Sequence, residues 1–117
     1  MDRAITERTK ALAVRIVRLC AALPRSGPAR VIGNQLLRSG TSVGAHCRES
    51  YRSRSLAELI SKLEVALQEL DESSYWLELL VETGIVPEVR LVPLLEEVNE
   101  LTAILVTSVK TLKRRRT

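Results

Sequence analysis

The segment QLLRSGTSVGAHCRES, residues 35–50, places the chain's only histidine, His46, beside one of its two cysteines, Cys47. A cysteine paired with a histidine base is a nucleophile in several kinds of enzyme. The segment has helical spacing, however, and adjacent residues of a helix point about 100° apart, so these two side chains do not face each other. Thr41 and Ser42 lack a second histidine or another base. We therefore expect the protein not to be an enzyme.

Metal and phosphate chemistry are not indicated either. Di-iron helical bundles use Glu-x-x-His pairs, and this sequence contains none. Haem and zinc sites would need more histidine or cysteine ligands than the chain has. Its interior glycines stand at helical spacing with no Walker lysine after them, so they do not form a phosphate-binding loop. The sequence predicts no metal and no cofactor.

Gly33, Gly40 and Gly44 share one helical face, seven and four residues apart. An interior glycine costs a helix about 1 kcal/mol, a cost that close approach of another backbone can offset. A helix broken by a turn at Ser39–Gly40 is the alternative. We predict an oligomer interface on this helix, formed by Ser39, Gly40, Thr41, Gly44 and His46. For His46 the alternatives are a contact with RNA and an inert, hydrogen-bonded residue at a helix seam.

The elements that must position these residues are four amphipathic helices. Apolar residues recur at helical spacing over about 4–23, 28–53, 56–83 and 88–113, and no stretch alternates as a strand would. Pro28 suits a first helical turn, Ser55–Glu58 forms a capping box, and Gly84 ends a helix. Pro93 predicts a kink or a delayed start in the fourth helix. With short connections, residues 1–117 form one domain, an all-α, up-down-up-down antiparallel four-helix bundle.

Cysteine usage and hydropathy predict a cytoplasmic protein. Cys20 and Cys47 stand far apart, outside any CxxC motif, as is typical of thiols in a reducing compartment. No apolar run reaches the roughly 18 residues that a membrane span requires. Charged residues interrupt the mildly apolar start of the chain, so a signal peptide is not indicated.

Charge is distributed in three blocks. Residues 1–54 hold eleven basic and three acidic residues (+8), residues 55–109 two and eleven (−9), and residues 110–117 five and none (+5). In an up-down-up-down bundle the ends of the second and fourth helices meet at one pole. Cations there also favour the helix dipoles, but arginine forks suit phosphate contacts, so nucleic acid is the expected partner. The predicted nucleic-acid-binding residues are Arg38, Arg48, Arg52, Arg54 and, in the basic tail 110–117, Lys110, Lys113, Arg114, Arg115 and Arg116.

The third helix is acidic, and Glu69, Glu72 and Trp76 lie along one line of it. This line is either a solvated face or an ion-pairing face, within the chain toward Arg48 or Arg52 of the second helix or between subunits. Tyr75 and Trp76 lack the interleaved aromatic residues of a single-strand binder, which favours core and interface packing over base stacking. We include Glu69, Glu72, Tyr75 and Trp76 in the predicted oligomer interface.

Two stretches, RSGTSVGAHCRES at 38–50 and SRSLAELISKLEVALQELDESSYWLELLVETG at 53–84, resemble the family of 23S rRNA intervening-sequence proteins. Its pattern runs R-S-x-T-S-V-G-A-N-x-x-E and then K-L-x-x-A-x-x-E-x-x-E-x-x-Y-W-L-x-L-L. The matching residues are Arg38, Ser39, Thr41, Ser42, Gly44 and Ala45, then Glu69, Glu72, Tyr75 and Trp76. His46 stands where the pattern has Asn; histidine keeps a donor and an acceptor there, but its charge depends on pH.

The resemblance implies a non-catalytic bundle that assembles as a ring-like homopentamer. It also implies kinship with the accessory variability determinant of diversity-generating retroelements, a basic pentamer that binds nucleic acid and a reverse transcriptase. We therefore expect a non-enzymatic oligomer that binds structured RNA or DNA through arginine-rich surfaces. The competing expectation is a structural adaptor whose oligomer docks a protein partner such as a reverse transcriptase.

Overall fold

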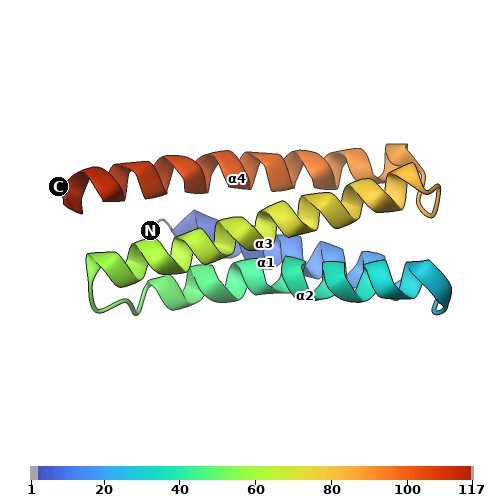
Figure 1. The fold of residues 1–117 in the computed structure, drawn as a ribbon, viewed down its shortest axis with the longest axis horizontal. Coiled ribbons are helices and arrows are strands. Elements are labelled where there is room, and N and C mark those ends of the chain that lie inside the picture. Colours follow the sequence, from blue (N-terminus) through green and yellow to red (C-terminus); the bar gives the residue numbers. More distant parts are fainter. Residues whose placement is uncertain (1–2, 117) are drawn as a thin grey trace.

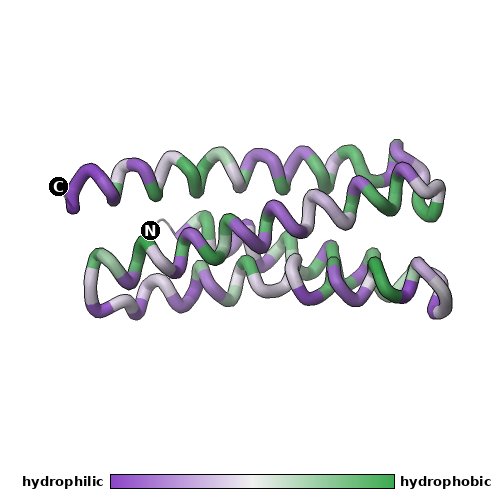
Figure 2. Tube along the Cα trace, viewed as in Figure 1, coloured by the Kyte–Doolittle hydropathy of each residue, from purple (hydrophilic) through white to green (hydrophobic). Residues whose placement is uncertain are grey.

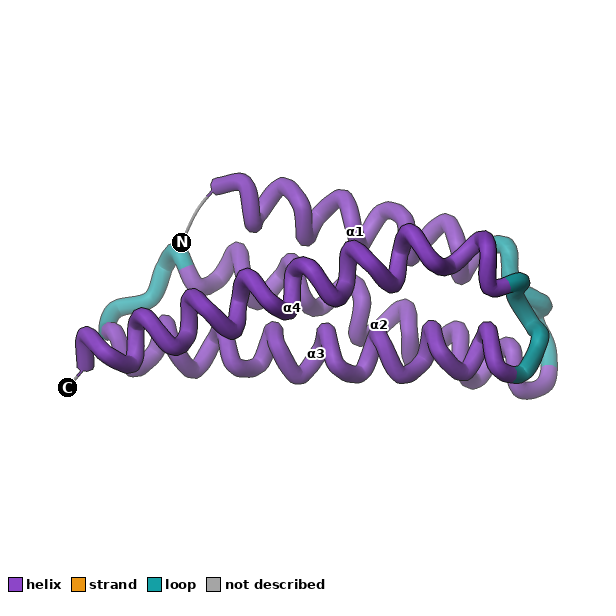
Figure 3. Tube along the Cα trace, turned by 90° about the horizontal axis from the view of Figure 1, so that it is seen from above, coloured by secondary structure: helices purple, strands orange, loops and turns teal. Residues whose placement is uncertain are grey.

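The computed structural model describes residues 3–116 and confirms the all-α prediction. Its helices are α1 (Arg3–Ala21), α2 (Gly27–Ser50), α3 (Leu56–Glu82) and α4 (Glu88–Arg116), and no strand occurs among the described residues. The helices run up, down, up and down along one long axis, with principal-axis extents of 47 × 21 × 20 Å (Figure 1). Each helix packs on its neighbours in the order α1–α2–α3–α4, and α4 closes the bundle against α1 (Figure 3).

One apolar stripe from each helix forms the core. Leu12, Ile16, Leu36, Leu70 and Leu105 are among the side chains that are fully buried at its centre. Figure 2 shows apolar segments recurring along each helix, whereas the C-terminal end of α4 is hydrophilic. Burial of such aliphatic side chains, each worth about 1.5–3 kcal/mol, is what holds the four helices together. None of the described helices is long and apolar enough to cross a membrane.

The helix ends follow their local sequences. The Ser55 hydroxyl accepts a hydrogen bond from the Glu58 backbone N–H at 3.1 Å, which caps α3. Glu58 Oε2 accepts from the backbone N–H of Arg54 at 3.2 Å, one residue earlier than the capping box predicts. Gly84 has a φ of +74°, a left-handed conformation that glycine adopts without strain just after a helix.

The fourth helix differs from its prediction at both ends. It begins at Glu88 and continues through Pro93, so the delayed start is wrong. Pro93 deprives only the Val89 carbonyl of its helical donor, and because Val89 is 80% exposed, water can reach that carbonyl. At its other end the helix extends to Arg116, so the basic residues up to that position form helical turns, while Thr117 lies outside the described residues. The first two helices, in contrast, end two or three residues earlier than predicted.

Gly40 lies where α2 packs against α1. The helix is continuous from Gly27 to Ser50, which excludes a turn at Ser39–Gly40. A Cβ placed on Gly40 would overlap Ile16 Cδ1 of α1 and would lie 3.0 Å from Ile16 Cγ2. The missing side chain therefore lets α2 approach α1 closely within one chain.

Candidate nucleic-acid interface

The C-terminal ends of α2 and α4 lie at the same end of the bundle, as the up-down topology predicts (Figure 1). The cations of these ends are all exposed to solvent. We call this set the basic pole; its members are Arg48, Arg52, Arg54, Lys110, Lys113, Arg114, Arg115 and Arg116. Those of α4 extend from consecutive helical turns, so the helix fixes their spacing.

The carboxylates nearest to the basic pole are already engaged. Glu49 Oε2 accepts a hydrogen bond from Lys62 Nζ at 2.9 Å, and Lys62 lowers the pKa of Glu49. Glu64 Oε2 accepts from Lys113 Nζ at 3.1 Å, and Glu58 accepts from the backbone of the α2–α3 loop. Within residues 3–116, six cations of the basic pole form no ion pair with a carboxylate: Arg48, Arg52, Arg54, Lys110, Arg115 and Arg116. They are free to contact phosphates.

Two further cations at this end were missed from the sequence. Arg3 and Lys10 belong to the N-terminal half of α1, which begins at the same pole. Lys10 and Arg48 line a groove of about 370 Å³ between α1 and α2, whose walls include Thr41 and Gly44. The predicted topology could have revealed them, because an up-down bundle places the start of its first helix beside the end of its second.

Arg38, predicted to bind nucleic acid, does not belong to the basic pole. It lies in the middle of α2, where its guanidinium contacts Glu72 at 2.6 Å and Glu69 at 3.4 Å on α3. The prediction that Glu69 and Glu72 form ion pairs with Arg48 or Arg52 is therefore wrong, because their partner on α2 is Arg38. The cause is the helix register, since the antiparallel packing places residues near 38 opposite residues near 72.

Ser39 and Gly40 are buried inside the protomer rather than exposed for a subunit interface, a second correction. The Ser39 hydroxyl lies 3.0 Å from the Ser73 hydroxyl, in a fully buried hydrogen bond between α2 and α3. Gly40 faces α1, as described above. Thr41 and Gly44 remain partly exposed along the groove that Lys10 and Arg48 line.

His46 is half-buried near α3, with 27% of its side chain exposed. Its Nδ1 lies 3.8 Å from Glu49 Oε2, beyond hydrogen-bonding distance. Among the described residues this nitrogen has no hydrogen-bond partner. His46 therefore lacks, at Nδ1, the hydrogen bond that an inert residue at a helix seam would form.

Tyr75 and Trp76 do not form a stacking platform. Their ring centroids lie 4.9 Å apart with planes inclined at 72°, an edge-to-face arrangement. Trp76 packs against the core, whereas Tyr75 is 54% exposed on the outer face of α3. Only Tyr75 is available to a partner.

The described residues contain no cluster of three or more side chains suited to a metal ion. Cys20 and Cys47 are both free thiols. Burial raises the pKa of Cys47 to about 11, which keeps it protonated at neutral pH, and burial also raises the pKa of Cys20. His46 and Cys47 thus show no sign of an activated nucleophile.

The family model described as 23S rRNA-intervening sequence protein matches residues 1–107. The chain belongs to this family. A similar solved structure is that of a protein of unknown function from the S23 ribosomal protein family of Bacteroides thetaiotaomicron, with 34% sequence identity and a TM-score of 0.83. The similarity covers 92% of this chain and 96% of that one. A comparison with curated proteins gives no significant match. The match to the intervening-sequence family ends before Lys110, so the cations of the last α4 turns lie beyond it.

Proposed function

We propose that this chain is a non-enzymatic, homo-oligomeric four-helix bundle that binds structured nucleic acid through its basic pole. One observation carries the proposal: six exposed cations from α2, the α2–α3 loop and α4 gather at one end and form no internal ion pair within residues 3–116. If these cations served only to stabilise the helix dipoles, fewer arginines would be sufficient. The pentameric state implied by the resemblance is part of the proposal, as is a cytoplasmic location, which two free thiols favour.

Phosphates fit this surface chemically. An arginine guanidinium can bind phosphate oxygens with two parallel hydrogen bonds and keeps its charge at any physiological pH. Binding releases condensed counterions, so affinity gained in this way falls steeply with salt. The name of the family refers to an intervening sequence of 23S rRNA, which makes structured RNA the first ligand to test.

The experiment is a fluorescence-anisotropy titration of a structured RNA hairpin and a matched DNA duplex over a salt series. The test variant carries Lys110→Gln, Arg115→Gln and Arg116→Gln, which remove charge while keeping good helix formers in α4. The control variant carries Arg15→Gln, Arg18→Gln and Arg90→Gln, which remove the same charge from exposed positions outside the basic pole. The proposal predicts a large loss of affinity in the test variant only. Equal losses in both variants, or no binding by the unaltered protein at low salt, would reject it.

A second candidate function is that of an adaptor that docks a protein, such as a reverse transcriptase. It is favoured by the apolar side chains Val17 and Leu37, which are 46% and 37% exposed beside a groove between α1 and α2. Docking through apolar contacts changes little with salt, whereas phosphate binding weakens. The salt series therefore separates the two functions.

A further inference from the structure

We propose that copies of this chain associate head-to-tail. A second groove between α1 and α2, distinct from the one that Lys10 and Arg48 line, receives the outer face of α3 of the next copy, centred on Tyr75. This inference rests on the homo-oligomer proposed above and identifies its two contact surfaces. Three observations support it. The groove is apolar with a basic rim, and the α3 face carries an exposed aromatic side chain flanked by acidic residues. The groove and this face also lie at the same position along the bundle axis.

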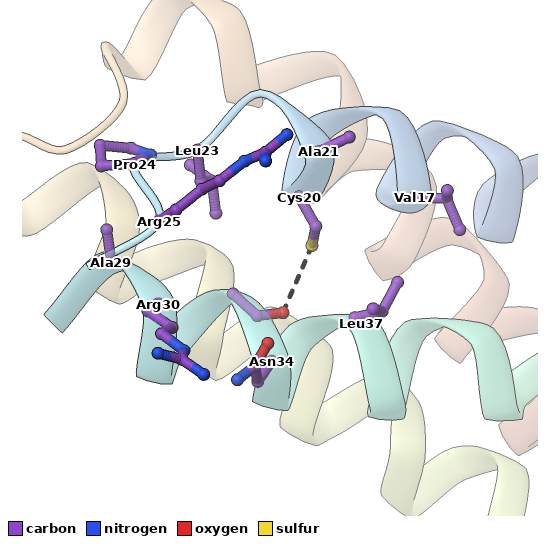
Figure 4. A pocket seen from close by; sticks show the side chains of 11 residues that line it. Val17, Cys20, Ala21, Leu23, Pro24, Arg25, Ala29, Arg30, Asn34 and Leu37 are labelled. Atoms are coloured by element: carbon purple, nitrogen blue, oxygen red, sulfur yellow. Dashed lines mark hydrogen bonds between the residues drawn. The ribbon is translucent and has the colours of Figure 1, made fainter. Parts of the chain in front are cut away.

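The groove lies between the C-terminal half of α1 and the N-terminal half of α2 and has a volume of about 450 Å³. Figure 4 shows Val17 and Leu37 at one end of it, and Arg25 and Arg30 toward the other. At the floor, Cys20 Sγ donates a hydrogen bond to the Gly33 carbonyl at 3.4 Å. Neither Arg25 nor Arg30 forms an ion pair within the described part of the chain.

The outer face of α3 has the complementary character. Tyr75 is its large exposed apolar side chain. Asp71, Glu78 and Glu82 surround it on the same exposed side and, within residues 3–116, pair with no cation. A tyrosine offers a large contact area with little conformational entropy to lose, which is why it often anchors protein interfaces.

The two surfaces lie at the same level of the bundle. The Ser39–Ser73 hydrogen bond fixes a common level for α2 and α3, which run in opposite directions. Leu37 and Tyr75 are each two residues from this level, toward the end of the bundle opposite the basic pole (Figure 1). Arg30 and Glu82 are each nine residues from it in the same direction. At a rise of 1.5 Å per residue, the second pair lies about 14 Å along the axis. Two parallel copies side by side therefore bring Tyr75 onto Leu37 and Glu82 beside Arg30.

The contact is heterologous, because the groove and the α3 face are different surfaces of one chain, separated by α2. Such a contact leaves a free groove and a free α3 face on every open assembly, so it either closes into a ring or continues as a filament. Opposite charges at its rim also exclude contacts of groove with groove or α3 with α3, since these would juxtapose like charges.

The experiment measures mass by light scattering after size exclusion, for the full chain and five variants. Leu37→Glu blocks the groove and Tyr75→Glu blocks the α3 face; each is expected to be a monomer of 13.1 kDa at concentrations where the unaltered protein assembles. Mixed in equal amounts, these two variants retain one intact groove and one intact α3 face, and should form a dimer of twice that mass and nothing larger. Arg30→Glu and Glu82→Arg should each weaken assembly, and both together in one chain should restore it.

Controls at exposed positions outside both surfaces, Arg15→Glu and Glu96→Arg, should assemble as the unaltered protein does. Assembly that persists in the groove and Tyr75 variants, a mixture that stays monomeric, or a double charge reversal without recovery would overturn the inference. If a groove variant fails to fold by circular dichroism, the charge-reversal pair decides, because both of its residues are exposed. A monomeric unaltered protein would reject the inference and the homo-oligomer together, while nucleic-acid binding by the basic pole is measured separately in the Lys110, Arg115 and Arg116 variant.

Discussion

Substitution of Gly40 by alanine tests the close approach of α1 and α2. The added Cβ would overlap Ile16 Cδ1 and would lie 3.0 and 3.3 Å from Ile16 Cγ2 and Cγ1. Ile16 is fully buried, so any movement of its side chain away from Gly40 must be accommodated by its neighbours in the core. Overpacking of this kind costs about 1–3 kcal/mol, and alanine returns about 1 kcal/mol of helix propensity. Because the added Cβ meets Cγ2 and Cγ1 as well as the terminal Cδ1 of Ile16, rotation of Cδ1 alone does not relieve the contact, and we expect a net loss of about 1–2 kcal/mol.

Urea denaturation at one fixed protein concentration measures this loss. At an m-value of about 1.5 kcal/mol/M, the midpoint should fall by about 1 M. Gly44→Ala is the matched control in the same helix, since its Cβ would lie 3.4 Å from the nearest atoms of Thr9, an ordinary contact. That variant should be as stable as the unaltered protein or gain up to about 1 kcal/mol.

Ile16→Val removes the clashing Cδ1 atom and provides the double-mutant cycle. Alone it should cost about 0.5–1.5 kcal/mol, and in its presence Gly40→Ala should cost less than in the unaltered chain. A Gly40→Ala variant as stable as Gly44→Ala, or two substitutions whose costs simply add, would refute the reasoning.

Three further predictions concern Arg38, Ser73 and Cys47. Arg38→Ala should lower the free energy of unfolding by no more than about 1 kcal/mol, because its pairs with α3 are solvent-exposed, and should leave RNA affinity unchanged in the anisotropy assay. Ser73→Ala should cost about 1 kcal/mol in urea denaturation by removing the buried bond to Ser39. In a Cys20→Ser background, Cys47 should react with a disulfide reagent at pH 8 only after unfolding. Its folded pKa of about 11 exceeds the unfolded value near 8.5, so its stabilising contribution is present below pH 8.5 and is lost as the pH rises toward 11.

Hydropathy period and helix-end signals were sufficient to predict four helices and their up-down order. Each helix buries one continuous stripe, as at Leu12 and Ile16, and short loops leave no other connection between neighbours. The C-terminal extension of α4 was underestimated, because the apolar stripe stops near Leu112. Lysine and arginine are good helix formers, and cations in a last turn favour the helix dipole, so the helix continues to Arg116.

The partners of individual side chains could not be predicted in the same way. The stripe of small residues on α2 indicates that a neighbouring helix comes close, but not whether that helix belongs to the same chain. Gly40 contacts α1 of its own chain, and Ser39 contacts α3 of its own chain. The pairing of Arg38 with Glu72 depends on the register of two antiparallel helices, which is fixed by side-chain packing across the core. Periodicity within one helix carries no information on that register.

The most direct test of nucleic-acid binding is the salt dependence of RNA affinity. Six cations of the basic pole without a carboxylate partner in residues 3–116 predict a slope of log K against log salt of about −5.4 per protomer on a duplex ligand. That slope means an affinity loss of about 2,000-fold between 50 and 200 mM salt. The variant with glutamine at positions 110, 115 and 116 should have a slope of about −2.7, and the variant with glutamine at 15, 18 and 90 should keep the original slope. A shallow slope for the unaltered protein, or the same reduction in both variants, would contradict the account.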